Sequence, residues 1–129
     1  MIAPHLAGPY VGYAFVQNAG PAGETLSSIR IKDLRDGKTY SGGTACDSPP
    51  LSGQNFIYSL QLKDNRSVAW INDQSDNNAN KDKIEVCAQD SLGRRQLDAG
   101  AGIDRKSLRL DSSTLTWSNA GVLRSAPLN

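Results

Sequence analysis

The sequence has few of the residues on which enzyme and metal sites most often depend. It contains one histidine, His5, and two cysteines, Cys46 and Cys87, among its 129 residues. His5 lies within residues 1–9, where we expect a flexible N-terminus, so it is poorly placed to act in a Ser-His-Asp triad. No G-x-S-x-G, H-E-x-x-H or Walker motif is present. These absences favour a non-catalytic protein and leave a glycosidase-type enzyme as the least favoured alternative.

An excess of charge of one sign is also lacking. The chain has 14 Lys and Arg against 13 Asp and Glu, and no basic block, so we predict no nucleic-acid partner. Its apolar runs are far shorter than the roughly 20 residues that span a bilayer, which predicts no membrane insertion. Residues 1–9 lack the basic start and apolar core of a signal peptide.

The two cysteines are best interpreted as one disulfide, Cys46–Cys87, in a chain rich in Gly, Ser and Asn. A disulfide predicts a secreted or extracellular protein whose signal peptide is not in this sequence. The alternative is two unrelated buried thiols in a cytosolic protein. Zinc binding is not expected, because two cysteines 41 residues apart with one distant histidine lack zinc-site spacing.

Part of the sequence occurs twice. Residues 59–70 read SLQLKDNRSVAW and residues 107–117 read SLRLDSSTLTW, an offset of 48 residues before the turn and 47 after it. At an offset near 55, YAFV at residues 13–16 resembles VAWI at 68–71, and SIRI at 28–31 resembles KIEV at 83–86. Repeats of this length are typical of modular β architectures.

The segments between the turns show strand periodicity. Phe56, Tyr58, Leu60 and Leu62 alternate as one face of a strand, and Asp36-Gly37 is a strong hairpin signal. No segment has helical periodicity beyond about two turns. We therefore predict an all-β domain over residues 10–128 with about ten strands, at 10–17, 27–35, 38–41, 56–63, 67–72, 83–89, 94–97, 107–110, 114–117 and 122–125.

These strands form roughly two and a half four-stranded repeats. A complete unit covers residues 56–97, preceded by a unit without its first strand and followed by one without its last. The period and strand count resemble β-propeller blades, with a two-sheet β-sandwich as the alternative. An incomplete set of blades cannot close a ring, so the propeller interpretation predicts a homo-oligomer that completes it.

The C-terminal residues 100–128 contain G-I-D-x-x-S-L-R-L, S-T-L-T-W and R-S-A. This pattern resembles the ends of uncharacterised secreted actinobacterial proteins. The resemblance implies bacterial origin, export and a β-rich fold, and it assigns no functional residue.

Two groups of residues are candidate sites. Trp70 and Trp117 occupy matching repeat positions, where they form either a sugar-binding platform or, as their apolar neighbours favour, the core between repeats. Asp73, Ser75 and Asn77 match positions 1, 3 and 5 of a calcium loop, although the required Gly and Glu are displaced, so a solvated loop is the alternative to a Ca²⁺ site. No other cofactor is expected.

The sequence thus predicts an exported binding or interaction module with a glycan, cell-surface or protein ligand. The alternative is a structural subunit that assembles through open blade edges.

Overall fold

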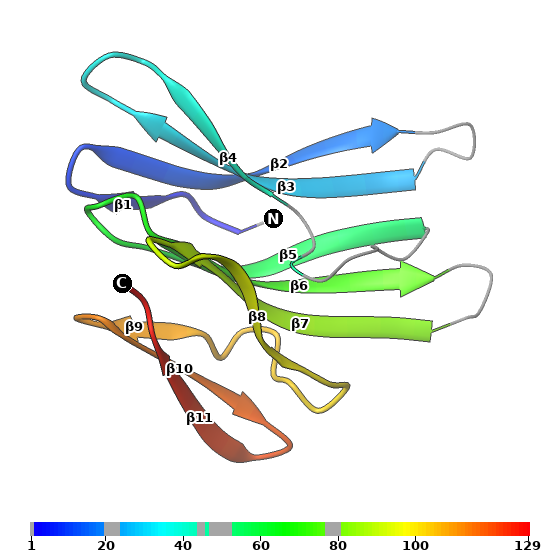
Figure 1. The fold of residues 1–129 in the computed structure, drawn as a ribbon. Helices are drawn as coiled ribbons and strands as arrows, with labels where there is room; N and C mark the ends of the chain where they lie inside the picture. The colour runs from blue at the N-terminus through cyan, green and yellow to red at the C-terminus, as the bar shows by residue number, and fades with distance from the viewer. Residues whose placement is uncertain (1, 20–23, 44–45, 47–52, 77–80) are drawn as a thin grey trace.

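The computed structural model is a stack of three antiparallel β-sheets (Figure 1). It describes residues 2–19, 24–43, 46, 53–76 and 81–129. These residues form eleven strands and no helix, which confirms the all-β class. No helix long and apolar enough to cross a membrane is found in the described ranges.

Each sheet is a meander of strands consecutive in sequence. The N-terminal sheet consists of β1 (His5–Ala7), β2 (Tyr10–Ala19), β3 (Glu24–Asp33) and β4 (Thr39–Gly43). The central sheet consists of β5 (Gly53–Leu62), β6 (Val68–Asp76), β7 (Lys81–Asp90) and β8 (Gly93–Ala99). The C-terminal sheet consists of β9 (Arg109–Asp111), β10 (Thr114–Asn119) and β11 (Val122–Pro127).

The predicted repeat units correspond to these sheets. The central sheet is the complete four-stranded unit, and the C-terminal sheet is the unit without its last strand. The N-terminal sheet has one strand more than the sequence pattern predicts, because His5–Ala7 pairs with β2. The strand count is therefore eleven rather than ten, in three packed layers rather than the two of a sandwich.

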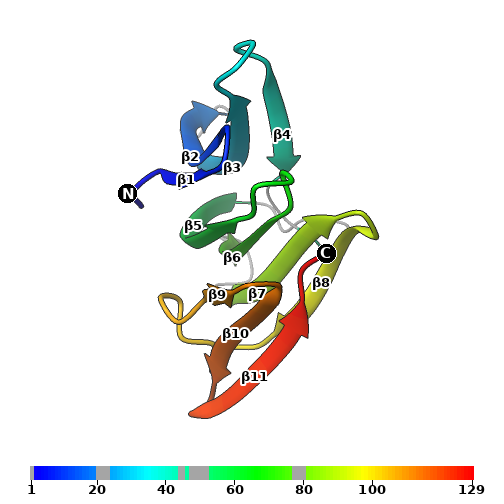
Figure 2. The same cartoon turned by 90° about the vertical axis from the view of Figure 1, so that its left-hand side faces the viewer.

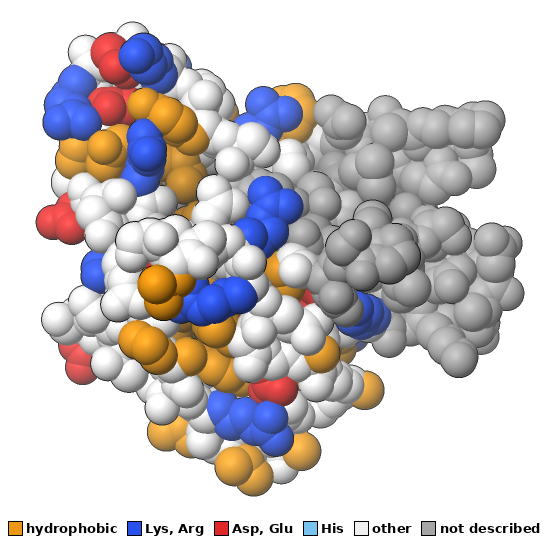
Figure 3. All heavy atoms as spheres, viewed as in Figure 1, with side chains coloured by type: hydrophobic (Ala, Val, Ile, Leu, Met, Phe, Trp, Pro, Cys, Tyr) orange, Lys and Arg blue, Asp and Glu red, His pale blue; other side chains and the backbone are white. Residues whose placement is uncertain are grey.

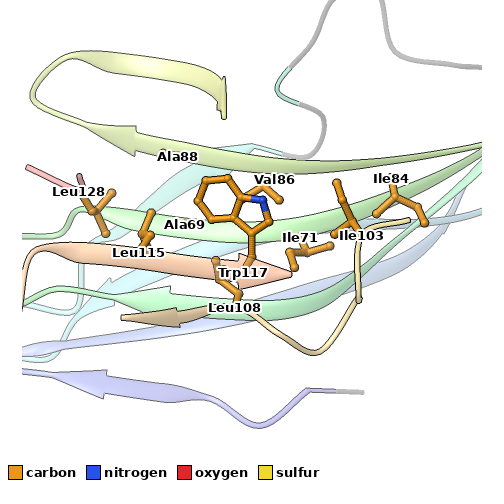
Figure 4. Packing of buried hydrophobic residues seen from close by; sticks show 10 residues of the cluster. All are labelled: Ala69, Ile71, Ile84, Val86, Ala88, Ile103, Leu108, Leu115, Trp117 and Leu128. Atoms are coloured by element: carbon orange, nitrogen blue, oxygen red, sulfur yellow. The ribbon is translucent and has the colours of Figure 1, made fainter. Parts of the chain in front are cut away.

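The central sheet is buried on both faces, because successive strand residues point to opposite sides. From β6, Val68 and Trp70 pack toward the N-terminal sheet, whereas Ala69 and Ile71 pack toward the C-terminal sheet. Figure 4 shows the second cluster, in which the Trp117 ring lies against the central sheet. The unbroken apolar run in β6 follows from this double burial.

The sheet stacking explains the sequence repeat. Trp70 and Trp117 each face the sheet that precedes their own. On the opposite faces, Ile29 of β3 and Ile84 of β7, 55 residues apart, each face the following sheet. The N-terminal and central sheets approach closely at Gly12, where an added Cβ would lie 3.3 Å from Leu62 Cδ2. The repeated residues are therefore those that join neighbouring sheets.

The edge strand β5 contains a β-bulge. Its register with β6 shifts between Ile57 and Ser59, so Tyr58 is an extra residue without a partner. The predicted single face of Phe56, Tyr58, Leu60 and Leu62 is therefore wrong: Ile57 and Leu60 pack in the core, while Phe56 is 37% exposed. A bulge bends the strand and redirects the inserted side chain.

The predicted disulfide is confirmed. Cys46 and Cys87 are bonded, with 5.5 Å between their Cα atoms, and Cys87 is buried in β7. The bond ties the connection between β4 and β5 to the central sheet.

Candidate ligand-binding site

The two tryptophans lie apart in the core. Trp70 is completely buried and Trp117 is 3% exposed, each between a different pair of sheets. Trp117 Nε1 donates a 2.8 Å hydrogen bond to Asp98 Oδ2. Neither ring presents a face to solvent, so they do not form a common surface platform.

Asp98 is the partly buried acceptor of the Trp117 hydrogen bond. Burial by itself would raise the pKa of this carboxyl. Hydrogen bonds from Trp117, Asn119 and the Ala99 N–H, together with the charge of Arg124, outweigh burial and lower the pKa. The ionised Asp98 carboxylate on β8 thus binds three residues of the C-terminal sheet, Trp117, Asn119 and Arg124.

Of the predicted calcium ligands, the structure locates the Asp73 side chain. Asp73 Oδ2 accepts a 2.7 Å hydrogen bond from Arg105 Nε, so its charge is paired with a guanidinium. Asn77 and the Ser75 side chain lie outside the described residues. The calcium site therefore remains a prediction.

One other group of potential metal ligands occurs among the described residues, namely Cys46, Glu85 and Cys87. The two sulfur atoms are bonded to each other, so they offer no thiolate. The Glu85 carboxylate is buried and accepts hydrogen bonds from the Cys46 N–H and from Gln96 Nε2. This arrangement fits a structural anchor for the disulfide.

A glycosidase needs a pair of carboxyl groups, and two aspartates at turns, Asp33 and Asp90, are held in local contacts instead. The Asp33 and Asp90 carboxylates accept the N–H two residues along the chain and form ion pairs with Arg35 and Arg95. The Arg35 hydrogen bonds lower the pKa of Asp33 to about 2. A glycosidase acid needs a raised pKa, so these groups do not resemble one.

An apolar hollow of about 450 Å³ lies between the N-terminal and central sheets. Its lining comes from β2, β3, β5, the chain start and the segment before β9. The lining residues are Ile2, Ala14, Val16, Ser27, Phe56, Ile57, Tyr58 and Lys106.

A second hollow of about 200 Å³ lies beside the first. The two share Ile2, Tyr58 and Lys106 in their linings. Figure 2 shows the chain start, β5 and the segment before β9 along one side of the molecule. The second lining is more polar and consists of Ile2, His5, Tyr58, Ser59, Leu60, Gln61, Lys106, Leu108 and Arg109.

Tyr58 is the central residue of this site because it lines both hollows. Its ring centroid is 6.4 Å from that of Phe56 and 5.6 Å from the Arg105 guanidinium carbon. Arg105 is in turn held by Asp73. The bulge, Phe56 and Arg105 thus hold the Tyr58 side chain where the apolar and the polar hollow meet.

The charged side chains among the described lining residues are basic. Lys106 lines both hollows, Arg109 lines the second beside His5, and no Asp or Glu occurs among the described residues of either lining. On the face drawn in Figure 3, Lys and Arg occur in small separate groups, some of them beside Asp and Glu. The site therefore combines apolar walls with positive charge at one end.

A third hollow, of about 270 Å³, surrounds Asn129 and is polar. Its polar groups bond to one another: Asn65 and Ser67 donate to the Asn129 carbonyl, and the Asn129 N–H donates to Asp90. Because these donors and acceptors are already paired, this hollow offers less to a ligand than the site around Tyr58.

Sequence reasoning did not find this site. Its residues come from positions as distant as Val16 and Lys106, and the bulge at Tyr58 does not disturb the alternation of side chains that the sequence shows in this strand.

Together, the fold and site define an all-β protein of three stacked sheets with a ligand-sized hollow at one sheet junction. No family model matches this sequence, and no curated protein or solved structure matches it.

Proposed function

We propose that this chain is an exported, non-catalytic binding module whose ligand is a small, largely apolar molecule. The observation that carries the proposal is the placement of Tyr58 by a β-bulge in the lining of two adjacent hollows. Bulges often redirect side chains at functional sites. Export is supported by the disulfide, which persists in oxidising compartments.

The size and lining of the site support a small ligand. The apolar hollow, about 450 Å³, is within the range of about 300–1,000 Å³ that is common for small-molecule sites. Phe56 and Tyr58 are the aromatic rings available for stacking, including on a glycan, whereas Trp70 and Trp117 are in the core. The first hollow has few polar groups to bind sugar hydroxyls, which favours an apolar ligand over a glycan.

A fluorescence titration with the uncharged probe N-phenyl-1-naphthylamine tests this proposal. We expect saturable binding to the native protein, weakened at least about tenfold by Val16→Glu, because that change places a charge in the apolar hollow. The matched control is Val122→Glu on the exposed end of β11, which should bind as the native protein does. Absence of saturable binding, or equal binding by both variants, would overturn the proposal.

Assembly is a second candidate function, favoured by one observation. Phe15 lies 55 residues before Trp70, at the equivalent repeat position, and it faces away from the stack. It is 39% exposed, with the Arg30 guanidinium carbon 4.5 Å from its ring centroid. Leu6, which pairs with Val11 on β2, is 75% exposed. The outer face of the N-terminal sheet therefore resembles a face that packs against a neighbouring sheet, although no sheet covers it among the described residues.

The occupant of that face, on this second proposal, is another copy of the same chain. Light scattering of the native protein should then give a multiple of the chain mass of 13.8 kDa, and Phe15→Glu should return it to that mass. Phe56→Glu, which changes an aromatic residue at the other site, should leave the assembly intact. A native monomer across a wide concentration range would contradict this second function.

A further inference from the structure

We infer that the ligand of the Tyr58 site is an amphipathic anion, with an apolar chain or ring and a carboxylate, sulfonate or phosphate head group. This inference rests on the proposed binding function and adds the chemical class of the ligand. It follows from the different character of the two adjacent hollows, which share Ile2, Tyr58 and Lys106.

The apolar end of the site accepts the body of the ligand. Ala14 and Val16 of β2 line the first hollow together with Phe56 and Ile57 of β5. Val16 is 45% exposed and Phe56 is 37% exposed, which is a large apolar surface to leave in water. Covering such surface stabilises a complex by roughly 25 cal/mol per Å² removed from water.

The other end presents unneutralised positive charge. Lys106 lines both hollows and is exposed, and no ion pair or hydrogen bond to its Nζ is found within the described part of the chain. Arg109 and His5 line the second hollow. None of the described lining residues of either hollow is a carboxylate, so a negatively charged head group meets Lys106 and Arg109 without a competing acid among them.

The backbone that carries Lys106 is held in place. Its N–H donates to Asp104 Oδ1 at 3.0 Å, and its carbonyl accepts a hydrogen bond from Arg109 Nη1 at 3.0 Å. Two β5 side chains tie the same segment to the sheet: Ser59 Oγ donates to the Arg105 carbonyl, and Gln61 Nε2 to the Leu108 carbonyl. The cation is thereby kept beside Tyr58, between the apolar and the polar hollow.

Arg105 has a different role from Lys106. Its guanidinium is paired with Asp73 at 2.7 Å and lies against the Tyr58 ring. Its charge is therefore largely compensated within the protein. Arg105 is best described as a positioning residue for Tyr58, and Lys106 as the residue that contacts the anionic head group.

Two fluorescent probes of similar aromatic size test the inference. We compare the anion 1-anilinonaphthalene-8-sulfonate with the uncharged N-phenyl-1-naphthylamine on the full chain. The native protein should bind the sulfonate more tightly than the uncharged probe. Lys106→Gln should weaken sulfonate binding about three- to tenfold, the size expected for one exposed charge-assisted contact, and should weaken binding of the uncharged probe by a smaller factor. Lys32→Gln, an exposed lysine on β3, is the matched control and should affect neither probe.

The outcomes separate the inference from the proposal on which it rests. If the uncharged probe binds in a Val16-dependent manner but Lys106→Gln does not weaken the sulfonate, the anionic ligand class is overturned and the binding function stands. If neither probe binds, the binding function itself falls. If Val16→Glu does not weaken sulfonate binding, the sulfonate binds outside the apolar hollow and the inference is overturned.

Discussion

The Glu85 carboxylate accepts the Cys46 backbone N–H at 2.9 Å, so the disulfide loop is held to β7 by a hydrogen bond as well as by a covalent bond. Glu85 is fully buried, two residues from Cys87 on the same face of β7. Gln74 Nε2 and Gln96 Nε2 also donate to its oxygens. A buried carboxylate is tolerated only when its acceptor positions are filled in this way.

Glu85→Gln should destabilise the protein by about 1–3 kcal/mol, because an amide NH₂ would replace an acceptor that faces several donors. The free energy of unfolding in urea at pH 7 measures this effect. The control is Asp111→Asn, an exposed carboxylate on β9. Equal unfolding free energies for the two variants would show that the Glu85 network does not stabilise the fold.

Reduction of the disulfide should lower stability further. Cys46 and Cys87 are 41 residues apart, and closing a loop of this size is worth about 4 kcal/mol on the chain-entropy model. Urea unfolding with and without a dithiol reductant gives the difference. A change below about 1 kcal/mol would mean that the described contacts hold the loop without the covalent bond.

Stability should fall as the pH is lowered from about 5 to 2. Burial would raise the pKa of Asp90, but hydrogen bonds from Arg95 and from the N–H groups of Asn129 and Leu92 lower it to about 2, against an ordinary value of 3.8. As the pH falls, the unfolded chain takes up the proton first, so the folded state loses stability.

Asp90→Asn should therefore be less stable than the native protein at pH 7 and should show a smaller loss of stability on acidification. The urea midpoint, measured from pH 6 to pH 2, gives both quantities. Parallel curves for the native protein and the variant would contradict the assigned role of Asp90.

Both tryptophans should be inaccessible to a charged quencher, because Trp70 is 0% and Trp117 3% exposed. Iodide should quench the native emission weakly and the emission of the urea-unfolded chain strongly. Trp117→Phe should also lower stability by about 1–3 kcal/mol, since it leaves Asp98 Oδ2 without the indole N–H and removes core volume. Strong native quenching would instead support a surface platform.

Much of the fold could be predicted from the sequence because it depends on local patterns. The repeat of residues 59–70 at 107–117 corresponds to two sheets in which Trp70 and Trp117 have the same role. β1 was missed because three residues, His5–Ala7, are too few to show periodicity. The bulge at Tyr58 was missed because an inserted residue shifts the pairing partner without changing residue type.

The site could not be predicted, because stacking of the sheets creates it. Val16, Tyr58 and Lys106 come together only when β2, β5 and the segment before β9 are packed. Glu85 did have a sequence signal: it is two residues from Cys87, so a strand places both side chains on one face.

The measurement that tests the binding account most directly is amide chemical-shift mapping with ¹⁵N-labelled protein and N-phenyl-1-naphthylamine. The account predicts that saturating probe shifts the amides of Ala14, Val16, Ile57, Tyr58 and Lys106, which line the first hollow. Amides of β10 and β11, in the C-terminal sheet, should be unaffected. Shifts confined to the C-terminal sheet or to the outer face around Phe15, or no shifts at all, would contradict it.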